Sequence, residues 1–304
     1  MFLGGVYMSL KKFLIIIVCL VATGAFAQQD FSKVQIETIP VAKGVYMLVG
    51  SGGNIGLSVG QDGAFLIDDQ YAPLTDKILK TISAVTDKPV RFLVNTHWHG
   101  DHTGGNETIG KGGTIIVAHD NVRKRLAKGQ FMKVFNVDIP PAPPKALPVI
   151  TFADSVTFHW NNETLEVMHP KPAHTDGDAV IYFKNANVVH AGDLFFNGIY
   201  PFIDAGSGGS MEGVITGTDE LLDRIDDNTK VIPGHGQLGN KTELKAYRDM
   251  LAAVHERMAN LIKEGKNIDE ILAAKPTADY DAKWGGGFLK PDQWVQIVYS
   301  VMQK

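Results

Sequence analysis

Residues 95–106 read Asn-Thr-His-Trp-His-Gly-Asp-His-Thr-Gly-Gly-Asn, and four potential metal ligands fall within six of these positions. The four are His97, His99, Asp101 and His102. Imidazole nitrogens and carboxylate oxygens are the donors that zinc and similar divalent ions select. A lone histidine beside a strand is usually an ordinary core or surface residue, but a solvated loop gives no reason for His-x-His-x-Asp-His spacing. The motif therefore predicts a metal site.

Three further residues of ligand type lie beside short β-branched segments. His174 stands just before the strand-like residues 179–183, Asp193 follows an apolar run, and His235 follows residues 230–232. Each is flanked by glycine or proline, which end strands and redirect side chains. The chain thus repeats one arrangement four times: a strand, a sharp turn and a ligand.

With these motifs the chain resembles the metallo-β-lactamase superfamily of dinuclear metal hydrolases, over roughly residues 36–265. The resemblance implies an α/β (α+β) fold, a four-layer αββα sandwich of two mixed sheets faced by helices, with the site at one edge. It also implies two bound ions, which we expect to be Zn²⁺, although other divalent metals suit these donors. The ligands implied for the first ion are His97, His99 and His174. Those implied for the second are Asp101, His102 and His235, with Asp193 bridging the two ions.

The elements that must position these ligands are predicted by hydrophobic periodicity and turn residues. The apolar residues 90–94 predict a buried strand that runs directly into the His-x-His motif. Residues 137–148 contain five prolines, so we expect a loop there, which could act as a lid over the site. The other predicted strands are residues 45–60 and 64–69 as a hairpin pair, 114–117, 155–158, 164–168, 179–183 and 187–190. The predicted helices are residues 75–85, 121–128, 210–225 and 241–264.

The first residues predict export. Lys11 and Lys12 precede an apolar run at 13–22, and Ala25-Phe26-Ala27 supplies a small-x-small cleavage site. We expect residues 1–27 to be a signal peptide, and 28–304 to be a single hydrolase domain with a short C-terminal extension. The mature protein would be periplasmic or secreted, without stable membrane association. A lipid anchor at Cys19 is the alternative, but no small residue precedes that cysteine.

Composition narrows the possible partners. Cys19 is the only cysteine, so the mature chain would have no disulfide and no cysteine ligand of the kind used by the best-known metallo-β-lactamases. Asp193 occupies the corresponding place, as in the glyoxalase II and lactonase branches. The chain has 29 Lys and Arg against 33 Asp and Glu, for a net charge of −4. It lacks the basic footprint of a nucleic-acid-binding protein, so we expect a small-molecule substrate.

The resemblance also implies a mechanism. A water shared by two cations loses its proton near neutral pH and attacks a carbonyl group. Asp101 would orient this nucleophile, and Tyr200 is a candidate to stabilise the oxyanion. Hydrolysis of a lactone or another ester-type bond is favoured over β-lactam hydrolysis. The reason is that Phe196 stands three residues after Asp193, where many family members use lysine to hold the substrate carboxylate.

Two other classes of protein remain open. One is a non-catalytic periplasmic metal-binding protein, although all seven ligand positions are filled. The other is a di-iron redox enzyme, although no flavin-binding domain is evident. Among the remaining residues, Trp98 alternates with the two histidines and is expected in the core, and His190 is expected to pack near the site.

Overall fold

The computed structural model describes residues 30–303, and the predicted signal peptide at 1–27 lies outside them. Phe31–Lys304 form one compact unit. None of the helices in this described region is long and apolar enough to cross a membrane. Four short 3-10 helices punctuate the unit, at Phe31–Lys33, Ala72–Leu74, Pro144–Ala146 and Ala205–Ser207.

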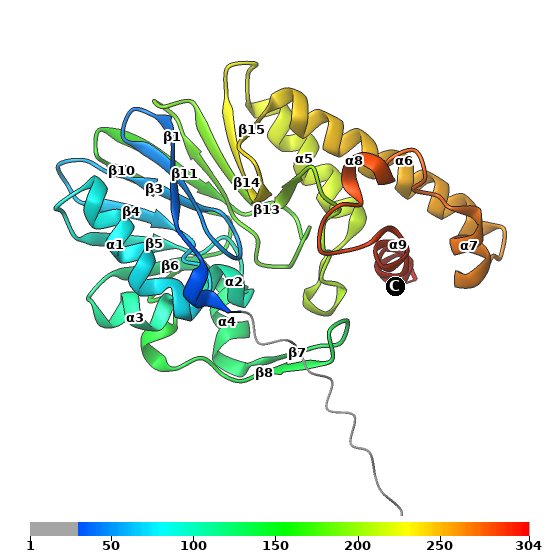
Figure 1. Cartoon of the computed structure of the whole chain (residues 1–304), viewed down its shortest axis with the longest axis horizontal. Coiled ribbons are helices and arrows are strands. Elements are labelled where there is room, and N and C mark those ends of the chain that lie inside the picture. Colours follow the sequence, from blue (N-terminus) through cyan, green and yellow to red (C-terminus); the bar gives the residue numbers. More distant parts are fainter. Residues whose placement is uncertain (1–29, 304) are drawn as a thin grey trace, which may run out of the picture. The chain divides into compact units, whose positions relative to one another are not determined.

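Two large mixed sheets lie at the centre of this unit (Figure 1). The first sheet has the order β1 (Glu37–Ala42), β2 (Val45–Val49), β3 (Ile55–Ser58), β4 (Ala64–Ile67), β5 (Val90–Val94), β6 (Ile115–His119) and β9 (Ile150–Phe152). The second has the order β10 (Ser155–Trp160), β11 (Glu163–Met168), β12 (Val180–Phe183), β13 (Val188–Asn197), β14 (Lys230–Gly236) and β15 (Gly239–Asn240).

Alternation along the strands decides which face each apolar side chain covers. In β4, Phe65 and Ile67 enter the cluster between the two sheets, whereas Leu66 enters the cluster on the outer face. In β12, Ile181 and Phe183 likewise join the cluster between the sheets. Because both faces of these strands are buried, their sequences are continuously apolar rather than alternating with polar residues.

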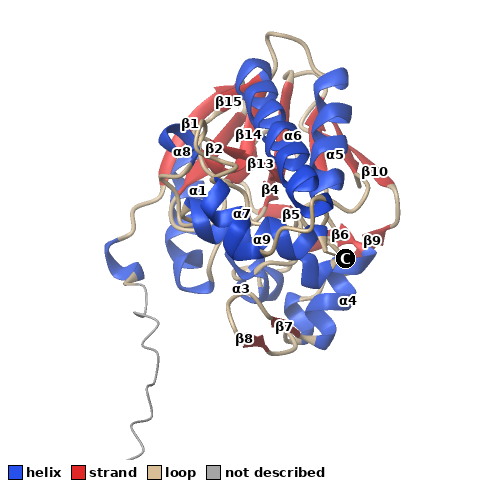
Figure 2. Ribbon diagram, turned by 90° about the vertical axis from the view of Figure 1, so that its right-hand side faces the viewer, coloured by secondary structure: helices blue, strands red, loops and turns tan. Residues whose placement is uncertain are grey.

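Helices cover the two outer faces. α1 (Thr75–Val85) packs Ile78 and Ile82 against the first sheet, and α5 (Met211–Arg224) and α6 (Lys241–Lys263) pack on the second. Figure 2 shows α5 and α6 in front of β13, β14 and β15. The four-layer αββα sandwich predicted from the sequence is therefore confirmed. The remaining helices are α2 (Gly100–Thr103), α3 (Asn106–Lys111), α4 (Asp120–Lys128), α7 (Ile268–Ala274), α8 (Asp281–Trp284) and α9 (Pro291–Met302).

Most predicted helix bounds agree with the structure because capping residues define them. The helix predicted at 210–225 is α5, and the Ser210 hydroxyl caps it by accepting a hydrogen bond from Gly213 N at 3.0 Å. The helix predicted at 241–264 is α6, which Asn240 and Glu243 begin with a capping box. The strand predicted at 187–190 is longer, since β13 continues to Asn197.

The proline-rich stretch is not the loop predicted for all of residues 137–148. Val137–Ile139 form β8, which pairs antiparallel with β7 (Gln130–Met132), and Pro144–Ala146 form a 3-10 helix. The prediction failed because the prolines begin only at Pro140, so the three preceding residues keep their backbone donors. Proline also suits the first position of a helical turn, where its fixed φ is already helical. The β7–β8 hairpin forms a small sheet of its own (Figure 1).

Candidate metal centre

Strands of both sheets and the segments that follow them supply the predicted ligands. His97 and His99 follow β5 of the first sheet, whereas Asp193 and His235 lie on the adjacent parallel strands β13 and β14 of the second. Gly234 permits this approach, because a Cβ there would stand 2.0 Å from Asp193 Oδ1. A glycine is therefore required where β14 passes the carboxylate.

Four of the predicted ligands form one buried group: His97, His99, His174 and Asp193. His99 Nδ1 lies 3.1 Å from His97 Nε2 and 2.9 Å from His174 Nε2. The carboxylate oxygen Oδ2 of Asp193 lies 3.4 Å from His174 Nε2. One donor atom from each residue lies within 4.8 Å of the others, so the four can reach a common centre.

Hydrogen bonds behind this group fix which ring nitrogens carry protons. His174 Nδ1 donates to the carbonyl of Phe202 at 2.7 Å, which leaves a lone pair on its Nε2. His99 Nε2 donates to Asp204 Oδ2 at 3.0 Å, which leaves a lone pair on its Nδ1. The two nitrogens that face each other are therefore both acceptors, and no proton joins them.

The tautomer of His97, the third histidine of this group, is fixed in the same way. Thr96 Oγ1 donates its proton to Asp68 Oδ2 at 2.7 Å, so its oxygen accepts from His97 Nδ1 at 3.0 Å. His97 Nε2 then also carries a lone pair. Burial lowers the pKa of His97 well below its usual value and that of His174 to about 4, so both rings stay neutral. Three lone pairs that converge without a proton form a site for a cation.

A second group consists of Asp101, His102 and His235. His235 Nε2 lies 3.3 Å from Asp101 Oδ2 and 3.4 Å from His102 Nε2. His102 Nδ1 donates to Asp68 Oδ2 at 2.7 Å, so its Nε2 is the nitrogen that faces the group. Burial opposes the charged form of His102, but Asp193, Asp101 and Asp68 raise its pKa well above the usual value. Burial opposes the charged form of His235, but Asp193 and Asp101 outweigh it and raise the pKa of His235 to about 9.

Asp193 lies between the two groups. Its Oδ1 is 3.2 Å from His102 Nε2, and its Oδ2 is 3.5 Å from His235 Nε2 as well as 3.4 Å from His174 Nε2. Oδ1 is buried and has no hydrogen-bond partner. Burial opposes its ionisation, but the surrounding histidines hold the pKa of Asp193 well below its usual range. This ionised oxygen among lone pairs fits two divalent cations that share one carboxylate.

The structure thus brings together all seven residues predicted as ligands, but it does not bring Tyr200 to them. The Tyr200 hydroxyl donates to Asp281 Oδ1 at 2.8 Å, and its ring stacks on Trp294 with centroids 4.1 Å apart. This engagement with Asp281 argues against the predicted role of Tyr200 in stabilising an oxyanion. Its side chain joins β13 to the C-terminal helices, a long-range contact that the local sequence does not reveal.

Two carboxylates behind the ligands were not predicted. Asp68 bonds His102 and Asp204 bonds His99, each on the ring nitrogen that faces away from the site. Such partners fix the tautomer and orientation of a metal-binding histidine. Asp68 follows an apolar strand, which is the signal that identified the ligands, so it could have been found. Asp204 follows no such strand.

Trp98 and His190 lie where the sequence predicted them, in the core and near the site. Trp98 is buried, and its indole donates to Ser207 Oγ at 3.0 Å. His190 is buried under the site, with Nε2 3.1 Å from the carbonyl of Asn54. Neither of them belongs to a ligand group.

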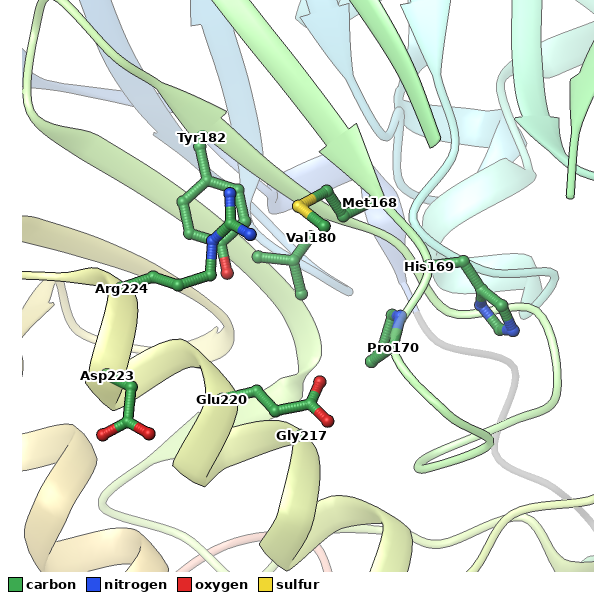
Figure 3. Close-up of a pocket in the computed structure, with 9 residues that line it drawn as sticks. All are labelled: Met168, His169, Pro170, Val180, Tyr182, Gly217, Glu220, Asp223 and Arg224. Carbon is green, nitrogen blue, oxygen red and sulfur yellow. The ribbon is translucent and has the colours of Figure 1, made fainter. Parts of the chain in front are cut away.

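A cavity of about 310 Å³ lies elsewhere, between α5 and strands β11 and β12 (Figure 3). None of the seven clustered ligands lines it. Arg224 lies over the ring of Tyr182 at 4.6 Å and donates to Glu166 at 2.9 Å, so its charge is already engaged. The cavity therefore lacks the converging donors that distinguish the metal centre.

Comparison with known proteins agrees with this geometry. The model of the metallo-beta-lactamase superfamily matches residues 48–272. The chain belongs to this superfamily. A hydroxyacylglutathione hydrolase of Pelagibacter ubique is 27% identical over 188 residues, which are 56% of this chain and 67% of that protein. A metallo-beta-lactamase type 2 of Bacillus cereus is 22% identical over 191 residues, which are 62% of this chain and 69% of that protein.

The solved structures confirm the fold. A metallo-beta-lactamase from Pontibacter korlensis has a TM-score of 0.61 at 22% identity, covering 72% of this chain and 99% of that one. The chain spans about two thirds of the length of the two curated relatives above. These relatives support a metal-dependent hydrolase that acts on a small molecule.

Proposed function

We propose that this protein is a dinuclear zinc hydrolase that opens a cyclic ester or amide, or cleaves an ester-type bond. One observation carries the proposal: the imidazole nitrogens of two neighbouring groups face common centres, and Asp193 lies between the groups. Five histidines and two carboxylates suit zinc better than harder ions, which prefer oxygen donors.

The chain's own residues have distinct tasks in this reaction. Two bound ions would supply a deprotonated water at neutral pH and polarise a carbonyl oxygen. Asp193 links the two groups. Asp68 and Asp204 fix the ring orientation of His102 and His99, so that the nitrogen opposite each carboxylate faces the site. Asp101, whose side chain is about one-fifth exposed, faces the open side and is placed to orient the nucleophile.

We propose, from the position of Asp193 between the two ligand groups, that this chain resembles ester and thioester hydrolases more than cysteine-liganding β-lactamases. One relative is named for hydrolysis of a hydroxyacylglutathione and another as a metallo-beta-lactamase, so both kinds of bond occur among the relatives. Phe196 stands where many β-lactamases hold the substrate carboxylate with lysine, and its ring stacks on His235 at 5.0 Å. β-Lactam hydrolysis is the second candidate. We also propose that residues 1–27 direct export.

The first experiment is to load the purified protein with zinc, determine its metal content, and assay a chromogenic cephalosporin beside an aryl ester. We expect two zinc ions per chain and a kcat/KM for the ester of at least about 10⁴ M⁻¹s⁻¹. Comparable turnover of the cephalosporin would support the second candidate. Failure to hydrolyse either substrate with two zinc ions bound would contradict both, and a chain that takes up iron instead would reopen redox chemistry.

A further inference from the structure

Aromatic rings surround the ligand cluster on the sides that carboxylates do not occupy. Phe196 stacks on His235 with ring planes 20° apart. Phe202 lies 5.7 Å from the ring of His99 and 5.9 Å from that of His174. Both rings are buried, so they form an apolar wall behind the two ligand groups rather than a surface that substrate touches.

The apolar wall continues outward on two segments that are far apart in sequence. Phe288, between α8 and α9, lies 6.5 Å from the ring of His235 and is 54% exposed. On the other segment, the β7–β8 hairpin, Phe135 contacts Phe202 at 5.0 Å. Phe131 and Val134 of the same hairpin are 55% and 48% exposed. Large apolar side chains that remain exposed around one site mark a binding surface for apolar groups.

The charge of the metal centre also favours an uncharged substrate. Four carboxylates contact the ligand histidines, and they are those of Asp68, Asp101, Asp193 and Asp204. Their charge equals that of two divalent cations, so the loaded centre has little net positive charge to attract an anion. Across the described residues, the ion pairs of the seven ligands are all with histidine or aspartate, never with lysine or arginine.

Two lysines do lie on the outer segments. Lys133 is exposed at the tip of the β7–β8 hairpin, and Lys290 is exposed beside Phe288, where its Nζ donates to the carbonyl of Gly287 at 3.1 Å. Both are solvated cations, and such charges contribute little to binding. They leave one alternative to an uncharged substrate, which is a substrate with an anionic group far from its scissile bond. An experiment must distinguish the two.

We propose that the site binds uncharged esters or lactones whose acyl or aryl body, several carbons long, lies against Phe288 and the exposed apolar face of the β7–β8 hairpin. This inference rests on the proposed hydrolase function and names its substrate class. It separates this chain from enzymes that recognise a carboxylate near the bond they cleave.

The test uses p-nitrophenyl esters, because the leaving group is then constant. For the zinc-loaded protein we expect kcat/KM to rise from acetate through butyrate to hexanoate, by about two- to fourfold for each methylene group that is buried. The p-nitrophenyl monoester of adipic acid has the hexanoyl chain length with a terminal carboxylate, and it should be hydrolysed more slowly than the hexanoate. A preference for the adipate or for the acetate overturns the inference but leaves the hydrolase function standing.

Variants of the exposed Phe288 test the wall itself. Phe288→Ala should lower the hexanoate-to-acetate ratio of kcat/KM several-fold. Phe288→Lys should raise the adipate-to-hexanoate ratio about fivefold, the effect of one ion pair in water. Val149→Ala is the matched control, because Val149 is 69% exposed at the sheet edge and should leave both ratios unchanged. If Phe288→Ala behaves like Val149→Ala, the wall does not bind substrate.

A binding measurement separates failure of the inference from failure of the function. Methyl ketones resemble these esters but cannot be hydrolysed. Calorimetry should show 2-octanone binding more tightly than 2-butanone, with the difference lost in Phe288→Ala. If the protein binds 2-octanone in this way but hydrolyses no ester, the hydrolase function is wrong and the apolar site stands. Equal binding of the two ketones overturns the inference.

Discussion

Asp68→Asn should weaken the second metal site more than the first. The Asp68 carboxylate is fully buried and accepts three hydrogen bonds of 2.7 Å, from Thr96 N, Thr96 Oγ1 and His102 Nδ1. In asparagine one oxygen can still accept from Thr96 N, but the amide group then presents N–H to His102. His102 Nδ1 must then accept a hydrogen bond from that N–H, so the proton of the neutral ring lies on Nε2 and occupies the lone pair that would face the metal.

The magnitude follows from this change of tautomer. Loss of the partner behind a metal-binding histidine costs about 10- to 100-fold in metal affinity. Alanine would be a poorer test, because it leaves three buried donors without an acceptor, at about 1–3 kcal/mol each. That sum approaches the whole stability of a typical domain, about 5–15 kcal/mol. Asparagine keeps the volume and one of the three hydrogen bonds.

Competition with a chelator measures the effect. We expect Asp68→Asn to lose the ion of the second group at about 10- to 100-fold lower chelator concentration. The other ion should be weakened less, because Thr96 Oγ1, which bonds His97, also loses its acceptor. Asp204→Asn should weaken the other ion, because Asp204 supports His99 of the first group. Asp226→Asn is the control, since Asp226 also accepts several hydrogen bonds but belongs to neither group. Unchanged affinity for both ions in folded Asp68→Asn would refute the reasoning.

The other predictions concern the ligands and their neighbours. Asp101→Ala and Asp193→Ala should each lower kcat by orders of magnitude while circular dichroism shows a folded chain; full activity in both would show that the centre is misassigned. Tyr200→Phe should leave ester hydrolysis unchanged but lower the free energy of unfolding by about 1 kcal/mol, because the bond to Asp281 is lost. A large fall in its kcat would instead restore a catalytic role. Gly234→Ala should lower zinc content measured by elemental analysis, because its Cβ would displace Asp193 Oδ1; normal zinc content would mean that β14 can move aside.

The ligands could be predicted from the sequence because each one is a local feature. His97 and His99 lie just after β5, a strand that is apolar except for Arg91, and alternation places both on one side. Asp193 and His235 follow the same pattern on β13 and β14. Ligand motifs that follow apolar runs depend on few residues, so the sequence shows them without knowledge of the tertiary fold.

The residues that were missed or misplaced depend on long-range contacts. The Tyr200 hydroxyl meets Asp281, 81 positions away, and Asp204 meets His99, 105 positions away. Phe288 lies beside His235, 53 positions away, and the preceding helix is packed through buried Trp284 against Tyr247. Nothing in the local pattern around these residues names the partner, so only the folded structure could assign them.

The origin of the ligands in both sheets has a consequence for the stability of the fold. One half of the sandwich contributes the His-x-His-x-Asp-His segment, and the other contributes Asp193 and His235. An ion bound by residues of both halves links them, and its binding free energy opposes their separation. By mass action, free zinc at 1,000 times its dissociation constant would add about 4 kcal/mol to the unfolding free energy. Removal of the metal by a chelator would then lower the free energy of unfolding as well as the activity. The concentration of free metal around the protein would therefore influence how long it stays folded.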